Sequence, residues 1–289
     1  MARLLEGKPI AEKIKEEIRQ AVQSLKKKPV LASVMAGENA GAQAYVKSQK
    51  KAADGLGIDY QFHKLPQDTQ ESALIEFIQK LNTDSSVNGI IIQMPLPAHI
   101  DYKRISQFIL PAKDIEGMHP ENIGRIVFGK AELVPCTPAA VMELLAASEA
   151  DLYGKEVVVV GHSEIVGKPL ALLLLEKFAT VTVCHIGTSK AGKLKEHVAR
   201  AEILIVAVGK AGLIKGEWIK EAAIVVDVGI NRVEDKIVGD VEYEEAFKRA
   251  SFITPVPGGV GPLTVTMLMR NLAKAASLQQ QRLTQHSAV

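Results

Sequence analysis

Short runs of β-branched residues, each followed by a turn and a helix-forming segment, constrain the fold of this chain most strongly. The clearest case is KEVVVVGHSEIVGKPLALLLL at residues 155–175, where an apolar run leads through a turn containing Gly161 and Gly167 into an apolar helix. A strand that is apolar on both faces is typical of a parallel sheet with helices on both sides. The sequence therefore predicts an α/β fold.

The first half of the chain shows the same alternation. Helices are predicted where apolar residues recur at helical spacing, over 8–25, over 41–56 and after 71. Strands are predicted at 29–37, 59–65 and 87–97. Asp68 and Glu71 fit a capping box before the third helix. Because ligands of parallel sheets gather at the carboxyl ends of the strands, Gln93 at the end of its strand is a candidate ligand contact.

A second strand and helix series begins after residue 136. Thr137 and Pro138 suit the N-cap and first turn of a helix, and the predicted domain boundary lies near them. Buried strands are predicted at 155–160, 180–185, 202–209, 223–231 and 251–257. Five strands with short crossovers predict a Rossmann-like unit.

Two domains are expected, because 289 residues exceed the roughly 100–200 residues of one domain. We assign residues 1–138 to the first domain and residues 139–267 to the second, with the last helix, 268–289, returning to the first. The polar end of the chain at 277–289 is expected to be frayed.

Composition and charge exclude several classes of protein. The net charge of +2 comes from interspersed acidic and basic residues, so we expect no nucleic-acid partner. No apolar run approaches the roughly 18 residues of a membrane span, and charges interrupt the N-terminus before a signal peptide forms. Cys136 and Cys184 have no metal-ligand spacing and read as buried thiols in a reducing compartment. We expect a cytoplasmic protein without a membrane anchor or a bound metal.

The turn GHSEIVGKP at 161–169 is the first candidate binding site. Exposed N–H groups where a strand feeds a helix bind a pyrophosphate well. The spacing differs from GxGxxG, since His162 and Ser163 stand where the middle glycine would be, so an ordinary strand-helix turn remains the alternative. The segment 184–190, after the next strand, offers neither an acid for a ribose hydroxyl nor an arginine for a 2′-phosphate.

The chain as a whole resembles a known family. The blocks YVKSQKKAADGLGI, GIIIQMPLP, KDIEGMHPENIGR, PCTP, GHSEIVGKP, GEWIK, VVDVGIN, GDV and ITPVPGGVGPLTVTML stand in the order seen in methylenetetrahydrofolate dehydrogenase/methenyltetrahydrofolate cyclohydrolase. The resemblance covers residues 4 to 275. It implies a folate-binding N-terminal domain, an NAD(P)-binding C-terminal domain, a cleft between them, a homodimer and a place in one-carbon metabolism and purine biosynthesis.

The resemblance also implies the site residues. Tyr45 is similar to the tyrosine that packs against the folate, and Gln93, between Ile92 and Met94, to a glutamine of the cleft. The loop that closes over the substrate corresponds to Pro257, Gly258, Gly259, Gly261 and Pro262. The dinucleotide contacts correspond to Gly161, His162, Ser163, Ile165, Gly167, Ile186 and Ile230.

Two positions depart from the family pattern, and both fall in the folate site. The catalytic lysine of the family stands four residues after the tyrosine, where this chain has Gln49. The family motif KDVDG ends in an aspartate that holds the pterin, where this chain has Glu116. At about 100° per residue, position 49 lies about 40° from Tyr45 on a helix. The lysines at 47, 50 and 51 lie about 160°, 140° and 120° away, so none of them can replace Gln49.

The departures affect the two family reactions differently. Hydride transfer from methylenetetrahydrofolate needs positioned rings and excluded water, and Gln49 permits it. Ring opening of the methenyl product needs a general acid or base, so Gln49 is expected to slow it by about 10²–10⁴-fold. We therefore expect a dehydrogenase with weak or absent cyclohydrolase activity. The alternatives are the full bifunctional enzyme, in which Gln49 holds a water that another group deprotonates, and a non-catalytic protein that binds folate or dinucleotide.

The expected coenzyme is NADP. The family resemblance and the basic residues Lys190 and Lys193 favour it. Ile186 favours NAD, because the family often places a small hydroxyl residue there.

Overall fold

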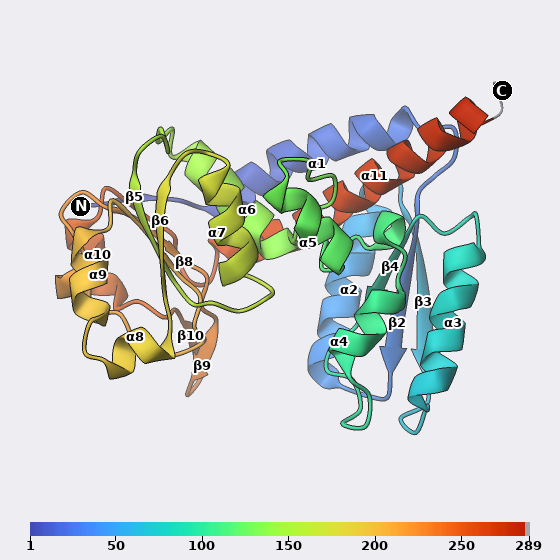
Figure 1. Cartoon of the computed structure of the whole chain (residues 1–289), viewed down its shortest axis with the longest axis horizontal. Coiled ribbons are helices and arrows are strands. Elements are labelled where there is room, and N and C mark those ends of the chain that lie inside the picture. The colour runs from blue at the N-terminus through green and yellow to red at the C-terminus, as the bar shows by residue number, and fades with distance from the viewer. Residues whose placement is uncertain (287–289) are drawn as a thin grey trace. The chain divides into compact units, whose positions relative to one another are not determined.

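The computed structural model describes the backbone of residues 1–286 and the side chains of residues 1–282. The chain forms two compact units (Figure 1). One contains residues 1–12 and 137–264 and is called here the six-stranded unit; the other contains residues 13–136 and the chain from 265 onward and is called the three-stranded unit. The α/β fold with two domains is thus confirmed. No helix among the described residues is long and apolar enough to span a membrane.

The three-stranded unit holds a parallel sheet in the order β3-β2-β4. Its strands are β2 (Val30–Ala36), β3 (Asp59–Leu65) and β4 (Gly89–Ile92). Its helices are α2 (Ala40–Asp54), α3 (Glu71–Thr83), α4 (Tyr102–Ile105) and α5 (Pro120–Val127), with 3₁₀ turns at Ser106–Phe108 and Pro111–Lys113. The unit boundaries fall within α1 (Gly7–Gln23) and α11 (Val260–His286), so each of these helices contributes residues to both units.

Strand alternation assigns the two faces of this sheet. Val30, Ala32 and Val34 of β2 join Leu74 and Ile78 of α3 in one buried cluster. The intervening residue, Ser33, therefore points to the opposite face, where α2 packs (Figure 1). A polar side chain in the middle of a fully buried strand is thus directed toward α2.

The six-stranded unit holds a parallel sheet in the order β1-β11-β8-β7-β5-β6. Its strands are β1 (Arg3–Leu4), β5 (Glu156–Val160), β6 (Thr180–Cys184), β7 (Ile203–Val206), β8 (Ile224–Asp227) and β11 (Phe252–Ile253), and a separate antiparallel hairpin joins β9 (Asn231–Val233) to β10 (Lys236–Val238). Its helices are α6 (Cys136–Ala147), α7 (Gly167–Leu175), α8 (Ile186–Lys190), α9 (Leu194–Arg200) and α10 (Tyr243–Arg249), with a 3₁₀ turn at Gly216–Trp218. The five strands predicted from the sequence lie in one sheet.

The sixth strand, β1, is not predicted from the sequence. Arg3 pairs with Phe252 and Leu4 with Ile253 in parallel register. The first residues of the chain therefore go with the six-stranded unit and not with the predicted first domain, 1–138. A two-residue strand has too short a pattern to be recognised before its partner is known.

Three local predictions are wrong. The capping box at Asp68 does not form: α3 begins at Glu71 after an extended Gln70, and the Glu71 carboxylate accepts a hydrogen bond from the distant Asp101 N–H. Thr137 is not an N-cap, because α6 already begins at Cys136. The end of the chain is helical to residue 286 rather than frayed, since α11 continues through it; residues 287–289 lie outside the described part.

Candidate active site

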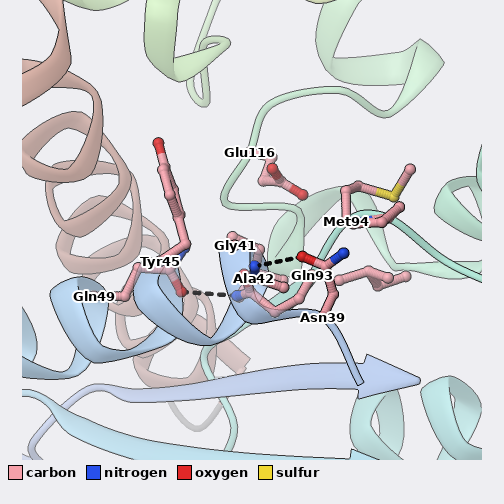
Figure 2. Close-up of a pocket in the computed structure, with 11 residues that line it drawn as sticks. Asn39, Gly41, Ala42, Tyr45, Gln49, Gln93, Met94 and Glu116 are labelled. Carbon is pink, nitrogen blue, oxygen red and sulfur yellow. Dashed lines mark hydrogen bonds between the residues drawn. The ribbon is translucent and has the colours of Figure 1, made fainter. Parts of the chain in front are cut away.

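Tyr45 and Gln49 lie one turn apart on α2, as helical spacing predicts (Figure 2). The Tyr45 side chain is 48% exposed, whereas Gln49 is completely buried. The neighbouring lysines all face solvent, at Lys47, Lys50 and Lys51. None of these lysines takes the place of Gln49 in the structure.

Gln49 lies at the centre of a buried hydrogen-bond network. Its Oε1 accepts from the Tyr60 hydroxyl at 2.9 Å and from Gln93 Nε2 at 2.8 Å. Gln93 Nε2 also donates to Ser33 Oγ at 3.0 Å. Gln49 Nε2 is buried and has no hydrogen-bond partner among the described residues. A buried donor without an acceptor costs about 1–3 kcal/mol.

Gln93 is held at the carboxyl end of β4, as predicted. Its backbone N–H donates to Val34 O at 2.8 Å, which continues the pairing of β4 with β2 by one residue. Its side chain can therefore reach α2 from a fixed backbone. The following Met94 is 48% exposed.

These residues surround a cavity of ≈ 440 Å³, called here the α2 pocket. Its walls come from the start of α2, the end of β4 and the loop before α5 (Figure 2). The lining residues are Asn39, Gly41, Ala42, Tyr45, Gln49, Ile91, Ile92, Gln93, Met94, Pro95 and Glu116. Asn39 also fixes the start of α2, because its side chain accepts from Ala42 N at 2.9 Å. All predicted folate contacts of this unit thus line one pocket.

The loop that carries Glu116 is anchored on both sides. Asn271 of α11 donates from Nδ2 to Ile115 O and to Val134 O, each at 2.8 Å. Asp114 accepts from Asn122 Nδ2 at 2.8 Å. On the other side Gly117 has φ +69°, and a Cβ there would lie 2.5 Å from the Val134 carbonyl carbon. The backbone at Glu116 is therefore fixed by its neighbours.

The environment of Glu116 favours the neutral form of its carboxyl group. Burial first and the nearby Asp114 charge second raise the pKa of Glu116 to about 8, against the opposing effect of a hydrogen bond from the Tyr102 hydroxyl at 3.3 Å. Burial also raises the pKa of Tyr45. Glu116 therefore combines a hydrogen-bond donor with an acceptor at neutral pH.

The turn after β5 requires both of its predicted glycines. Gly161 has φ +128°, and a Cβ there would lie 2.3 Å from Ala207 O. A Cβ on Gly167 would lie 2.0 Å from Gly161 O. Close packing of this kind between strand and helix is what the glycines of dinucleotide turns provide. The residues between them, His162 to Glu164, are exposed before α7 begins.

Other predicted dinucleotide contacts are exposed in the same unit. Ile165, Ile186 and Ile230 are 57%, 67% and 67% exposed. The His162 ring lies 5.1 Å from the His185 ring, which connects the turn after β5 to the end of β6. Ser163 Oγ accepts from Val166 N at 3.1 Å. The described residues contain no cluster of His, Cys, Asp and Glu that could hold a metal ion.

The predicted substrate loop belongs to the six-stranded unit. Gly258 has φ +116°, and its carbonyl accepts from Gly7 N at 2.9 Å. A Cβ on Gly7 would lie 1.9 Å from Gly259 O. Pro257 precedes this contact, and Gly261 and Pro262 lie in the first turn of α11. The structure fixes the shape of this loop within its own unit.

Sequence reasoning missed three residues that support the site. Tyr60 and Ser33 bind Gln49 and Gln93, and Tyr102 binds Glu116. The only sequence signal is a serine inside the apolar run VLASVMA, which implies a polar partner across the sheet face.

Two domain models of one enzyme family together match most of the chain. The model of the tetrahydrofolate dehydrogenase/cyclohydrolase catalytic domain matches residues 5–116, and the model of the NAD(P)-binding domain of the same enzymes matches residues 135–280. The chain belongs to the tetrahydrofolate dehydrogenase/cyclohydrolase family. The resemblance drawn from the sequence blocks is thereby confirmed.

Relatives align over nearly the whole chain. The bifunctional protein FolD of Acetivibrio thermocellus is 51% identical over 282 residues, which are 96% of this chain and 98% of that protein. The bifunctional FolD structure from Campylobacter jejuni, a methylenetetrahydrofolate dehydrogenase/cyclohydrolase, is 45% identical with a TM-score of 0.92, covering 96% of this chain and 99% of that one. The Trypanosoma brucei enzyme, solved with NADP cofactor and an inhibitor, is 37% identical with a TM-score of 0.90, covering 96% and 98%. These names favour the bifunctional alternative over the expectation of weak cyclohydrolase activity.

Proposed function

We propose that this protein oxidises 5,10-methylenetetrahydrofolate to 5,10-methenyltetrahydrofolate and transfers the hydride to a nicotinamide dinucleotide. The observation that carries the proposal is the α2 pocket, where a half-exposed Tyr45 ring stands beside Gln49, Gln93 and Glu116 in a cavity of ≈ 440 Å³. A pocket of this size, with a few placed polar groups, suits one heterocyclic ring system.

The chemistry of the hydride step fits these side chains. Loss of hydride from the methylene carbon leaves a cation that two flanking nitrogens stabilise, so the protein has to orient the donor ring and exclude water. The Tyr45 ring offers a flat face for stacking, and the Gln49 side chain lines the same pocket. The step needs no titrating side chain at position 49.

The turn from Gly161 to Gly167 suits the dinucleotide. The glycines allow a close approach between the turn and the start of α7, and a pyrophosphate is stabilised at a helix N-terminus of this kind. The nicotinamide ring of a dinucleotide bound at this turn would be the hydride acceptor. The chain's own residues bind and orient it.

We propose NADP as the coenzyme. The end of β6 reads Cys184, His185 and Ile186, so the turn carries no carboxylate that would repel a 2′-phosphate. The NADP complex of the Trypanosoma brucei relative supports the same choice. Initial rates with each coenzyme decide the matter, and a kcat/KM at least ten times higher with NAD would contradict it.

Ring opening of the methenyl product is the second activity to consider. The names of the bifunctional relatives favour it. The buried Gln49 amide argues that it is slow here, because an amide neither takes up nor releases a proton in this pH range, and the exposed lysines of α2 do not reach the site. We propose a dehydrogenase whose product leaves mainly as the methenyl cation.

The assembly is proposed to be a homodimer in the cytoplasm, as the family resemblance implies. Sedimentation of the full chain tests the dimer. The activity is tested with 5,10-methylenetetrahydrofolate and each coenzyme, by following nicotinamide reduction and methenyl absorbance separately. Binding of both ligands without nicotinamide reduction would show a non-catalytic binding protein instead.

A further inference from the structure

The strand order of the six-stranded sheet indicates where this unit binds a ligand. β5 pairs with β6 on one side and with β7 on the other. The chain therefore reverses its winding between β5 and β7. Ligands of open parallel sheets bind at the carboxyl ends of the two strands that flank such a reversal. The turn at 161–167 follows β5, and residues 207–212, called here the β7 loop, follow β7.

The carboxylate of Asp240 holds the β7 loop by three successive backbone N–H groups. Its Oδ2 accepts from Val208 N at 2.7 Å and from Gly209 N at 3.0 Å, and its Oδ1 accepts from Lys210 N at 2.8 Å. Gly209 has φ +65°, in the left-handed region that lets successive N–H groups converge on one anion. The anion in this concavity is a side chain of the protein itself.

Asp240 also holds the segment that follows β8. Its Oδ1 accepts from Asn231 Nδ2 at 2.8 Å, and Asn231 directly follows Ile230, which is 67% exposed. Asp240 is completely buried, whereas Gly209 of the β7 loop is exposed. One buried carboxylate thus connects two exposed segments at the carboxyl ends of neighbouring strands.

Asp240 is in turn attached to the sheet through Asp227, the last residue of β8. Asp227 Oδ1 accepts from Asp240 N at 3.0 Å, and Asp227 Oδ2 accepts from Val241 N at 2.9 Å. The donors here are backbone N–H groups, which cannot act as acceptors, so the direction of each bond is fixed. The Asp240 carboxylate is therefore supported by a buried strand.

The β7 loop contacts the turn after β5. Ala207 N donates to Val160 O at 2.8 Å, and Ala207 O would lie 2.3 Å from a Cβ on Gly161. A displacement of the β7 loop would therefore also disturb the turn that suits a pyrophosphate.

We propose that Asp240 is a positioning residue for the coenzyme, because its carboxylate fixes the β7 loop and, through Asn231, the place of Ile230 before the dinucleotide binds. The inference rests on the proposed use of a nicotinamide dinucleotide. A loop that is ordered in advance loses little conformational freedom on binding, so the affinity is higher than for a mobile loop. Asp240 acts through the segments that it holds.

Asp240→Asn tests this role in the full chain. The amide has nearly the same shape, but its NH₂ group faces backbone N–H groups where an oxygen accepted from them. We expect the affinity for NADP, measured by calorimetry, to fall at least about tenfold. Hydrogen exchange of peptides that cover residues 207–212 is expected to become faster. Asp235→Asn, at an exposed position of the same hairpin, is the matched control and should change neither quantity.

The affinity for 5-formyltetrahydrofolate separates positioning from a merely structural role. The α2 pocket belongs to the three-stranded unit, so we expect this affinity to change less than about twofold in Asp240→Asn. In initial-rate measurements the KM for NADP should rise, with kcat little changed. A smaller folded fraction would instead lower kcat and leave the KM for NADP unchanged.

Asn231→Ala provides an independent variant, because it removes one donor to Asp240 and keeps the carboxylate. We expect NADP binding about threefold or more weaker than in the wild type, since Ile230 loses its neighbouring anchor. Cooperative thermal unfolding verifies that each variant is folded. If Asp240→Asn does not fold, the result for Asn231→Ala decides.

Several outcomes would overturn the inference. Unchanged NADP affinity in a folded Asp240→Asn, or in Asn231→Ala, would remove the positioning role, as would unchanged exchange of residues 207–212 in Asp240→Asn. Equal weakening of NADP and 5-formyltetrahydrofolate binding would show a structural role only. A wild-type chain that binds neither NADP nor NAD would contradict the proposed function itself.

Discussion

The Tyr60 hydroxyl donates a hydrogen bond of 2.9 Å to Gln49 Oε1, and so ties β3 to the buried face of α2. Gln93 donates to the same oxygen from the end of β4. The side chain at position 49 is therefore held from two strands. Position 49, which lines the α2 pocket, thus carries a buried amide and not a titrating amine.

Tyr60→Phe removes one of the two donors to Gln49. We expect the free energy of unfolding to fall by about 1 kcal/mol, because the buried Oε1 keeps only its bond from Gln93. Urea unfolding measures the change. Tyr153→Phe, which removes an exposed hydroxyl, is the matched control and should leave the stability within about 0.5 kcal/mol. Equal effects of the two substitutions would contradict the role given to Tyr60.

Gln49→Lys restores an amine at the position that the family uses. We expect hydrolysis of methenyltetrahydrofolate to rise at least tenfold, since burial lowers the pKa of such an amine and makes it a usable base. The decay of methenyl absorbance measures the rate. Gln43→Lys, on an exposed position of the same helix, should leave the rate unchanged.

Glu116 complicates that rescue. Its side chain is one methylene longer than an aspartate, so the pterin can sit too far from position 49 for the new amine to act. The double change with Glu116→Asp is then expected to succeed where the single change fails. Failure of both variants, each folded and active as a dehydrogenase, would show that position 49 does not control ring opening.

Glu116 also links stability to pH. Its folded pKa of about 8 lies above the unfolded value near 4.3, so the folded state binds more protons between these values. This contribution is fully present below about pH 4 and is lost as the pH rises toward 8. Between pH 5 and pH 8 the stability of the wild type should therefore fall by at least about 1 kcal/mol relative to Glu116→Gln. Thermal unfolding across this range measures the difference, and a constant difference would contradict the assigned shift. Glu217→Gln, on the surface, is the control.

Gly161→Ala tests the dinucleotide turn. The added Cβ would lie 2.3 Å from Ala207 O at a φ of +128°, so we expect a loss of about 1–3 kcal/mol in stability and at least tenfold weaker dinucleotide binding. Gly124→Ala in α5 is the control, because its Cβ meets no atom within 4 Å and a helical alanine is favourable. Unchanged dinucleotide affinity in a folded Gly161→Ala variant would show that the coenzyme does not bind at this turn.

Strand periodicity and helix spacing were sufficient to predict the features that depend on local sequence. The parallel sheets, the position of Gln93 at the end of β4 and the shared side of Tyr45 and Gln49 all follow from the repeat of a strand or a helix. The buried state of Gln49 does not, because it requires the partners Tyr60 and Gln93 from two other strands.

Features that depend on a distant partner could not be predicted. β1 exists only through its pairing with β11, more than two hundred residues later. The Glu71 carboxylate accepts a hydrogen bond from the Asp101 N–H and does not form the predicted capping box. The pairing of Tyr102 with Glu116 joins the start of α4 to the loop before α5, and the two sequences carry no common pattern. In each case tertiary contact overrides the local signal.

The most direct test of the proposed function is a single assay of the purified full chain with 5,10-methylenetetrahydrofolate and NADP. Nicotinamide reduction and methenyl absorbance are followed at separate wavelengths, and 10-formyltetrahydrofolate is quantified at the end. We predict that reduced nicotinamide and methenyltetrahydrofolate rise together, and that the methenyl product then decays no faster than in buffer. Conversion to 10-formyltetrahydrofolate at a rate comparable to nicotinamide reduction would contradict the role of Gln49, and absence of reduction with either coenzyme would contradict the dehydrogenase itself.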